Sequence, residues 1–156
     1  MSANTPPDLY RPNVAAILRN ASGRILTCER ADWPGCWQFP QGGVKRAESP
    51  EEALKREVME ELGIPSSAYI VLSSKGPYHY LFSGGAKRKG WIGQAQTYFL
   101  AELTNEDIPL NLDGPPREFR DTRWIYPHEF TLNGIPSMKH DVYRQVFSDF
   151  FNIQIS

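Results

Sequence analysis

Apolar residues follow two spacings along the chain, and each spacing predicts one type of element. Short runs rich in apolar and β-branched residues, bounded by turn-forming residues, predict strands. We expect six such strands, over residues 14–19, 24–29, 69–74, 78–82, 94–103 and 120–126. The turn Asn20-Ala21-Ser22-Gly23 joins the first two strands. The strands carry most of the predicted core.

Two segments have helical spacing instead. Ser49 followed by Pro50 is a typical helix start, because Ser caps the first turn and Pro fits the first helical position. Gly63 ends this helix, which is predicted over residues 50–62. A second amphipathic helix is predicted over residues 140–151. We expect loops over residues 32–43, 83–90 and 105–116.

Composition narrows the class of protein. With 156 residues, 40% hydrophobic and 22% charged, the chain fits one soluble domain over residues 1–156. Its net charge of −1 excludes a protein that coats DNA by charge alone. No apolar run is long enough to span a membrane, and the first eight residues do not resemble a signal peptide. The composition leaves the oligomeric state open.

The two cysteines do not point to a metal site. Cys28 and Cys36 lack the CxxC spacing, and no further cysteine completes a zinc site. We interpret them as reduced thiols in a cytoplasmic protein, with a disulfide as the alternative.

Acidic residues concentrate on the first predicted helix. Six of the eighteen acidic residues lie between Glu48 and Glu61. On a helical wheel, Glu57, Glu60 and Glu61 border the apolar stripe of the helix. Like charges at this spacing repel one another, and hard divalent ions such as Mg²⁺ take carboxylate oxygens. A metal site is one interpretation, and a solvated acidic helix is the other.

A motif of fixed spacing includes the same helix. Gly42 is followed by Glu48 and then by Arg56-Glu57-Val58-Met59-Glu60-Glu61-Leu62-Gly63-Ile64. This pattern resembles, position for position, the signature box of the Nudix hydrolases. Gly42 and Gly43 are expected to let the chain turn tightly before the helix. Glu48 is expected to reach Arg56 and hold the loop against the helix.

The resemblance extends beyond the box. Further matching segments are Tyr10-Arg11-Pro12-Asn13-Val14, residues 37–43, Gly93-Gln94-Ala95-Gln96, Glu118-Phe119 and residues 139–143. They are similar to one Nudix branch, which holds the bacterial RNA 5′-pyrophosphohydrolases and the asymmetrically cleaving diadenosine tetraphosphate hydrolases. The resemblance implies an α/β fold, the Nudix α/β/α sandwich with a mixed β-sheet between helices. It also implies a Mg²⁺-dependent attack of water on a phosphoanhydride, with Mn²⁺ as a substitute ion.

The same resemblance implies roles for particular residues. The metal ligands would be Glu57, Glu60, Glu61 and Glu118, and the general base would be Glu57 or Glu60. The substrate-binding residues would be Arg11, Arg30, Gly42, Gly43, Tyr80, Lys139 and Tyr143. The structural residues of the box would be Glu48, Arg56 and Gly63. Trp33, Trp37, Trp91 and Trp124 are expected to anchor the core or loops, with platforms for a base as the alternative.

Several substrates are compatible with this pattern. The expected partner is a nucleotide or an RNA 5′-end. Diadenosine tetraphosphate would give ATP and AMP, and triphosphorylated RNA would lose pyrophosphate. A nucleoside diphosphate sugar or another small diphosphate is an alternative substrate. A non-catalytic nucleotide-binding module is a further alternative, although such modules usually lose the box carboxylates that stand here.

Overall fold

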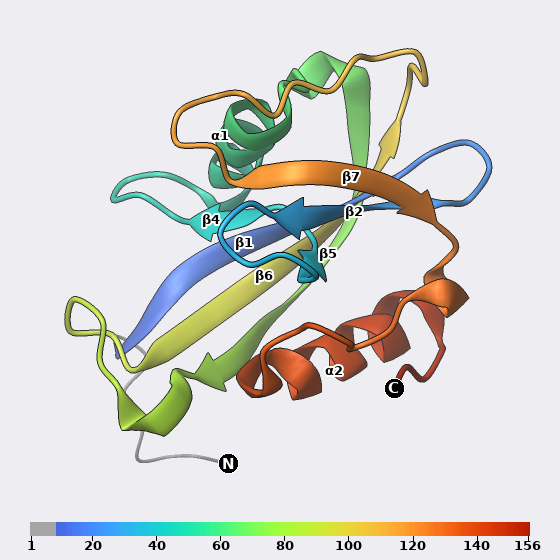
Figure 1. The fold of residues 1–156 in the computed structure, drawn as a ribbon. Coiled ribbons are helices and arrows are strands. Elements are labelled where there is room, and N and C mark those ends of the chain that lie inside the picture. Colours follow the sequence, from blue (N-terminus) through green and yellow to red (C-terminus); the bar gives the residue numbers. More distant parts are fainter. Residues whose placement is uncertain (1–8) are drawn as a thin grey trace.

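The computed structural model describes residues 9–156 as strands packed between two α-helices (Figure 1). The strands are β1 (Tyr10–Arg19), β2 (Ile25–Arg30), β3 (Trp37–Gln38), β4 (Gln41–Gly43), β5 (Tyr69–Leu81), β6 (Gly93–Leu103) and β7 (Phe119–Ile125). The α-helices are α1 (Pro50–Leu62) and α2 (His140–Phe151). Short 3₁₀ turns precede β5, follow β5 and β7, and lead into α2.

The strands form one mixed sheet. Its order is β3-β2-β1-β6-β5, with β4 paired to β1 and β7 paired to β2. β1 and β6 run parallel, from the pair Tyr10–Gly93 to the pair Arg19–Glu102. The other strand pairs are antiparallel. β1 lies in the middle of the sheet, and its long apolar run suits a strand covered on both faces.

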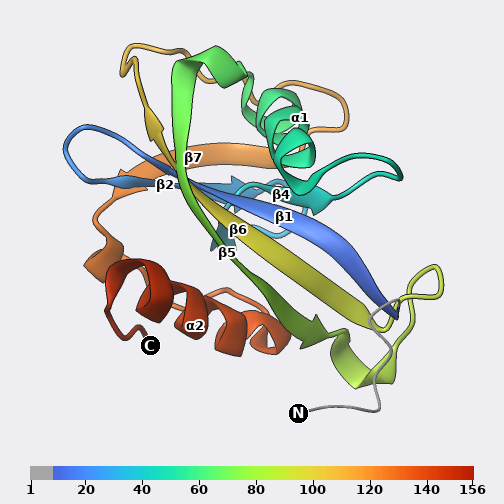
Figure 2. The ribbon, with the colours of Figure 1, turned by 180° about the vertical axis from the view of Figure 1, so that it is seen from behind.

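The two α-helices cover opposite faces of the sheet (Figures 1 and 2). Side chains alternate along β1, so Val14 and Ala16 join the core under α1. Ala15 and Ile17 join the core on the α2 side. The predicted α/β/α sandwich with a mixed sheet is therefore confirmed.

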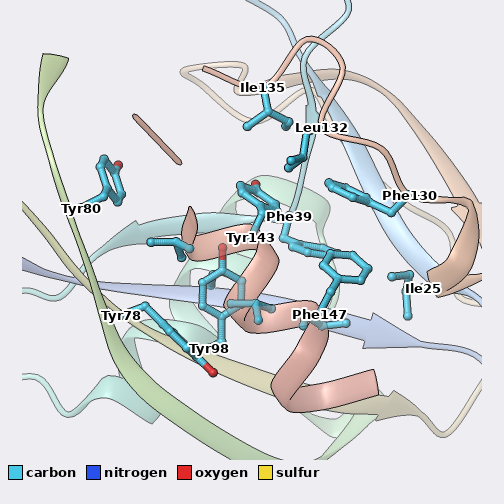
Figure 3. Packing of buried hydrophobic residues seen from close by; sticks show 14 of the residues in the cluster. Ile25, Phe39, Tyr78, Tyr80, Tyr98, Phe130, Leu132, Ile135, Tyr143 and Phe147 are labelled. Atoms are coloured by element: carbon cyan, nitrogen blue, oxygen red, sulfur yellow. The ribbon is translucent and has the colours of Figure 1, made fainter. Parts of the chain in front are cut away.

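The core on the α2 side is rich in aromatic side chains (Figure 3). The ring of Phe39 stacks on Phe130, Tyr143 and Phe147, with centroid separations of 5.8, 6.0 and 5.9 Å. Tyr80 lies at the margin of this cluster on β5 (Figure 3). Phe39 lies between β3 and β4, so these contacts fix the short segment that leads into β4.

Both ends of α1 follow the sequence signals. Ser49 accepts a hydrogen bond from the Glu52 backbone at 3.1 Å, and the Glu52 side chain accepts one from the Ser49 backbone at 2.9 Å. This capping box satisfies backbone donors of the first turn. Gly63 ends the helix with a φ of 71°, a conformation that favours glycine. The predicted bounds of both α-helices are confirmed.

The strand predictions need two corrections. The segments predicted separately over 69–74 and 78–82 form one strand, β5, whose register shifts between Lys75 and Tyr78. Pro77 lies in that shift and lacks an N–H for the ladder, which explains the break in the pattern. The expected loop over 32–43 contains β3 and β4, because these short strands pair with distant β2 and β1.

Other sequence expectations have mixed outcomes. Cys28 and Cys36 are free and buried, which confirms the prediction of reduced thiols. The segment 105–116 contains no helix or strand, as predicted. No helix within residues 9–156 has the length and apolar character needed to cross a membrane. The first eight residues, on which the signal-peptide prediction rests, lie outside the described residues.

Candidate active site

A cleft of about 390 Å³ opens beside α1, β1, β4 and the start of β7. Its charged lining residues are Glu57, Glu61, Glu118, Arg11, Arg30, Arg88 and Lys139. Its uncharged polar lining residues are Asn13, Gln38, Gln41, Gln94 and Tyr80. The remaining lining residues are Gly42, Gly43, Trp33, Phe119, Pro136 and Met138. The cleft thus brings together residues that are far apart in the sequence.

Gly42 and Gly43 form part of the cleft wall, but not as a tight turn. Both lie in β4, which pairs with β1, and neither has a positive φ. The prediction of a tight turn at this point is therefore wrong. A Cβ on Gly42 would collide with the carboxylate of Glu57, and a Cβ on Gly43 would collide with the guanidinium of Arg11. The two glycines let these charged groups approach the strand.

Arg56 ties the loop before α1 to the helix. Its guanidinium donates to both carboxylate oxygens of Glu48, from Nε at 2.8 Å and from Nη2 at 2.9 Å. Nη2 also donates to the carbonyl of Gly43 at 2.8 Å. The predicted contact between Glu48 and Arg56 is confirmed, and it fixes β4 relative to α1.

The same guanidinium also orients two acidic residues of the box. Nη1 of Arg56 donates to Glu57 at 2.6 Å and lies 3.4 Å from Oε2 of Glu60. The sequence predicts only a structural role for Arg56. Its contacts with Glu57 and Glu60 were not predicted. Arg56 partly offsets the repulsion between Glu57 and Glu60 and holds the two carboxylates near each other.

Three carboxylates gather on one side of the cleft. Glu57 and Glu61 come from successive turns of α1, and Glu118 directly precedes β7. Burial and the neighbouring Glu57 raise the pKa of Glu61, whose residue is only 6% exposed. Burial and Glu57 also raise the pKa of Glu118. Negative charge here is therefore only partly compensated by the protein.

Glu60 has a different environment from that expected. Its side chain is 57% exposed and does not line the cleft. The expectation that all three box glutamates border the buried stripe holds for Glu57 and Glu61 and is wrong for Glu60. Glu60 lies farther from the apolar stripe of α1 than Glu57 and Glu61 do, where the helix surface faces solvent.

The acidic side of the cleft has the donor chemistry of a cation site. Within residues 9–156, no three His, Cys, Asp or Glu side chains converge closely enough to hold a metal ion. Arg56 draws Glu57 and Glu60 toward itself. Carboxylate oxygens are nevertheless the ligands that hard divalent cations take. The raised pKa values of Glu61 and Glu118 show where a cation would relieve repulsion.

Basic residues line the remainder of the cleft. Lys139 is buried at 6% exposure, and this burial, with a smaller effect of Arg30, lowers its pKa to about 8. Arg30 forms a two-point ion pair with Asp32, at 2.9 and 2.7 Å. Arg11 is held beside Gly43 on β4. The cleft therefore has an acidic side and a basic side.

The two predicted tyrosines lie in different places. Tyr80 lines the cleft, and its hydroxyl accepts a hydrogen bond from Gln94 at 2.7 Å. The Nζ of Lys139 lies 5.9 Å from the centroid of the Tyr80 ring. Tyr143 does not line the cleft, because its ring is buried against Phe39 and Phe130 in the core. The structure therefore does not bring Tyr143 together with the other predicted substrate-binding residues.

Sequence reasoning missed several residues of the wall. Asn13 and Gln41 line the cleft, and buried Gln96 behind them donates to Asn13 at 3.0 Å and to Gln41 at 2.7 Å. Polar residues within otherwise apolar strands are the signal that marks this network, since buried amides need partners. Trp33 was expected to be an anchor, yet it is 50% exposed and lines the cleft near Arg30.

Comparison with known proteins agrees with this geometry. The family model for the NUDIX domain matches residues 9–150. The chain belongs to the Nudix family. This confirms the predicted family, and Nudix hydrolases generally use divalent metal ions.

Individual Nudix relatives match nearly the whole chain. An RNA pyrophosphohydrolase of Teredinibacter turnerae is 37% identical over 147 residues, covering 91% of this chain and 85% of that protein. Nudix hydrolase 26, chloroplastic, of Arabidopsis thaliana is 37% identical over 159 residues, covering 96% and 73%. A crystal structure of a C. elegans Ap4A hydrolase binary complex superimposes with a TM-score of 0.67 at 18% identity, covering 92% and 99%. That structural likeness shows the shared Nudix fold.

Proposed function

We propose that this protein is a Mg²⁺-dependent pyrophosphohydrolase of nucleoside polyphosphates. Its substrates are 5′-triphosphorylated RNA ends, from which it removes pyrophosphate, and diadenosine tetraphosphate, which it cleaves to ATP and AMP. The observation that carries this proposal is one cleft with an acidic side and a basic side. Relatives at 36–38% identity that are named RNA pyrophosphohydrolase support the RNA substrate. The resemblance to the asymmetrically cleaving branch supports the dinucleotide.

The acidic residues suit a site for divalent cations. Glu57, Glu61 and Glu118 would hold Mg²⁺, with Mn²⁺ as a substitute, and Glu60 is the fourth candidate ligand because Arg56 holds it near Glu57. Bound divalent ions neutralise phosphate oxygens and lower the pKa of water.

The chain itself supplies a base and its orientation. Glu57 lines the cleft and is held at its Oε1 by Arg56, so it can accept a proton from a water beside the phosphate chain. Glu60 is the alternative base, although its side chain faces solvent. The network of Gln41, Gln96 and Asn13 holds the polar groups behind β4 in place.

The basic residues suit a phosphate clamp. Lys139 offers a compact positive charge, while Arg11 and Arg30 offer planar guanidinium groups. Such a clamp would set which phosphorus atom faces the carboxylates. A misplacement of about 1 Å can cost a hundredfold in rate, so this register would decide the products.

Two further proposals concern the domain organisation of the protein and its location in the cell. We propose that residues 1–156 form a single domain, because both hydrophobic cores share one sheet. A cytoplasmic location is proposed because both cysteines are free thiols.

A parallel turnover assay tests the proposed function. Diadenosine tetraphosphate, triphosphorylated RNA and a nucleoside diphosphate sugar are supplied at equal concentrations with Mg²⁺. We expect turnover of the first two substrates, and none with EDTA in place of Mg²⁺. Turnover of the nucleotide sugar alone would contradict the substrate class while leaving the family intact. Binding of all three without product release would instead indicate a non-catalytic module.

A further inference from the structure

A second, smaller groove adjoins the cleft. Its volume is about 240 Å³, and its lining residues are Arg11, Phe82, Arg88, Lys89, Trp91 and Gln94. Arg11, Arg88 and Gln94 also line the cleft, so the two hollows share a wall. The groove therefore lies directly beside the cleft.

The outer wall of the groove is a tight hairpin. Arg88 and Trp91 exchange two backbone hydrogen bonds, each 2.9 Å long, and residues Lys89 and Gly90 form the turn. Both turn residues have positive φ, 53° at Lys89 and 86° at Gly90, which is the pattern of a type I′ turn. Asn or Gly adopts the first turn position more easily than Lys does. Lysine at this position is thus conformationally costly, which points to a use for its charge.

The hairpin carries positive charge without an acidic partner. Within residues 9–156, Lys87, Arg88 and Lys89 form no ion pair with a carboxylate. The guanidinium of Arg88 lies 4.7 Å from the centroid of the Phe82 ring, which fixes it at the mouth of the groove. Trp91 is half-buried and presents an aromatic surface to the same groove. Cations next to an aromatic surface are the features that bind a phosphate with an attached base.

An unpaired acceptor lies on the shared wall. The Gln94 side chain donates from Nε2 to Tyr80, while its Oε1 is buried and has no hydrogen-bond partner in the described part of the chain. A buried acceptor without a partner is costly. A hydroxyl or amino group of a bound molecule would satisfy it.

A dinucleoside polyphosphate carries a nucleoside at each end of its phosphate chain. We propose that, when this phosphate chain lies in the cleft, the groove binds one of the two nucleosides, here called the distal nucleoside. The inference rests on the proposed function and names a specificity subsite for it. Lys89 and Arg88 would contact the distal phosphate, Trp91 would stack on the base, and Gln94 Oε1 would accept from a ribose hydroxyl or a base amine.

The size and charge of the groove favour this small occupant over an RNA chain. At about 240 Å³ the groove is smaller than the usual range for pockets that enclose drug-sized ligands, so it suits one nucleoside. Of its three cationic residues, Arg88 and Lys89 lie on one hairpin and Arg11 lies on β1, and the chain has a net charge of −1. Proteins that hold a longer nucleic acid backbone use a continuous basic track.

The test compares two substrates that differ only in the distal nucleoside. Diadenosine tetraphosphate has it, and adenosine 5′-tetraphosphate lacks it. The variants are Lys89→Asn, which suits the turn but removes the charge, and Trp91→Leu, which keeps apolar packing but removes the ring. Lys87→Asn is the matched control, because Lys87 lies on the same hairpin but lines neither hollow. Thermal melting of each variant confirms that it is folded.

We expect Trp91→Leu to lower kcat/KM for diadenosine tetraphosphate about tenfold, with adenosine 5′-tetraphosphate unaffected. Lys89→Asn should lower kcat/KM for both substrates, because both carry the distal phosphate. Lys87→Asn should change neither value. Equal losses on both substrates for Trp91→Leu, or no loss on diadenosine tetraphosphate for either variant, would overturn the proposal.

Two further outcomes are distinguishable. The triphosphorylated dinucleotide pppApG and ATP form a second substrate pair. A variant effect confined to pppApG would overturn the proposed occupant and assign the groove to the second nucleotide of RNA. Failure of the wild-type protein to cleave any phosphoanhydride substrate would contradict the proposed function itself, before any variant is compared.

Discussion

At the scale of single residues, Arg56 shows how one side chain serves both the fold and the site. It holds Glu48 and the Gly43 carbonyl on one side and Glu57 and Glu60 on the other. Movement of the loop before α1 is therefore coupled to movement of the candidate base. Lys139 is the second informative residue, because burial rather than a salt bridge dominates its environment.

Glu48 should stabilise the protein in a pH-dependent way. Arg56 and the Lys45 backbone lower the pKa of Glu48 to about 2, below its value of about 4.3 in an unfolded chain. Its stabilising effect is therefore present above about pH 4.3 and is lost as the pH falls toward 2. Glu48→Gln should lower the Tm at pH 7, and the difference from wild type should shrink below pH 4.3. Melting curves across this range measure it, and a constant difference would contradict the assignment.

Lys139 should make catalysis sensitive to alkaline pH. With a pKa of about 8, its ammonium loses a proton as the pH rises past that value, so a phosphate substrate loses a positive partner. We expect kcat/KM of wild type to fall above pH 8. Lys139→Arg should lack this fall, because arginine stays protonated. Identical pH profiles of the two proteins would show that Lys139 does not bind the substrate.

At the scale of elements, β4 and α1 form the candidate site as a pair. The close approach of Gly42 to Glu57 and of Gly43 to Arg11 requires both glycines. Arg56 links the same strand and helix through the Gly43 carbonyl. The box is therefore a strand, a loop and a helix whose spacing is set by contacts between them.

Adjacent alanine substitutions in β4 should have different kinetic effects. Gly42→Ala displaces the Glu57 carboxylate and should lower kcat about a hundredfold. Gly43→Ala displaces the end of Arg11 and should mainly raise KM, because a flexible cation at the edge of the site moves. Each variant is the control for the other, and steady-state kinetics measure both. The same kcat loss in both variants would contradict the separate roles of the two glycines.

The acidic side of α1 should respond to Mg²⁺. A ligand that binds only the folded state stabilises it, so Mg²⁺ at ten times its dissociation constant should add about 1.4 kcal/mol, or roughly 3–6 °C in Tm. Glu61→Gln should lose most of this rise. Melting with Mg²⁺ and with EDTA measures the effect for each protein. An equal rise in both would show that Glu61 is not a ligand.

At the scale of the whole molecule, the sandwich brings four distant segments to one cleft. Arg11 on β1, Glu57 on α1, Glu118 before β7 and Lys139 before α2 share it. The pairing of β1 with β4 and the pairing of β2 with β7 bring the segments of Arg11, Glu57 and Glu118 toward one another. The distance between the acidic and basic sides is therefore a property of the fold.

This fixed spacing predicts asymmetric cleavage. A clamp at one end and carboxylates at a set distance along the phosphate chain select one phosphorus atom. Diadenosine tetraphosphate should give ATP and AMP, and triphosphorylated RNA should retain one 5′-phosphate. Reaction in ¹⁸O-water, followed by mass spectrometry, shows which product gains the label. ADP as the only adenine product would contradict this register.

Local signals in the sequence determined the helices and the chemistry of the box. Ser49, Pro50 and Gly63 act within a few residues of themselves, so the bounds of α1 could be predicted without tertiary contacts. The contact between Glu48 and Arg56 could also be predicted, because it lies within the motif. Free cysteines and the mixed sandwich likewise followed from composition and resemblance.

Only the tertiary structure decided which residues share the cleft. β3 and β4 are too short for a periodic pattern and depend on pairing with distant strands. Tyr143 has the same chemistry as Tyr80, yet packing around Phe39 buries one while the other reaches the cleft. The helical wheel could not separate Glu60 from Glu61, because their burial depends on what lies beside α1. Packing between residues far apart in the sequence decides which of these side chains are buried and which reach the cleft. The spacing of residues along the chain carries no information on that packing.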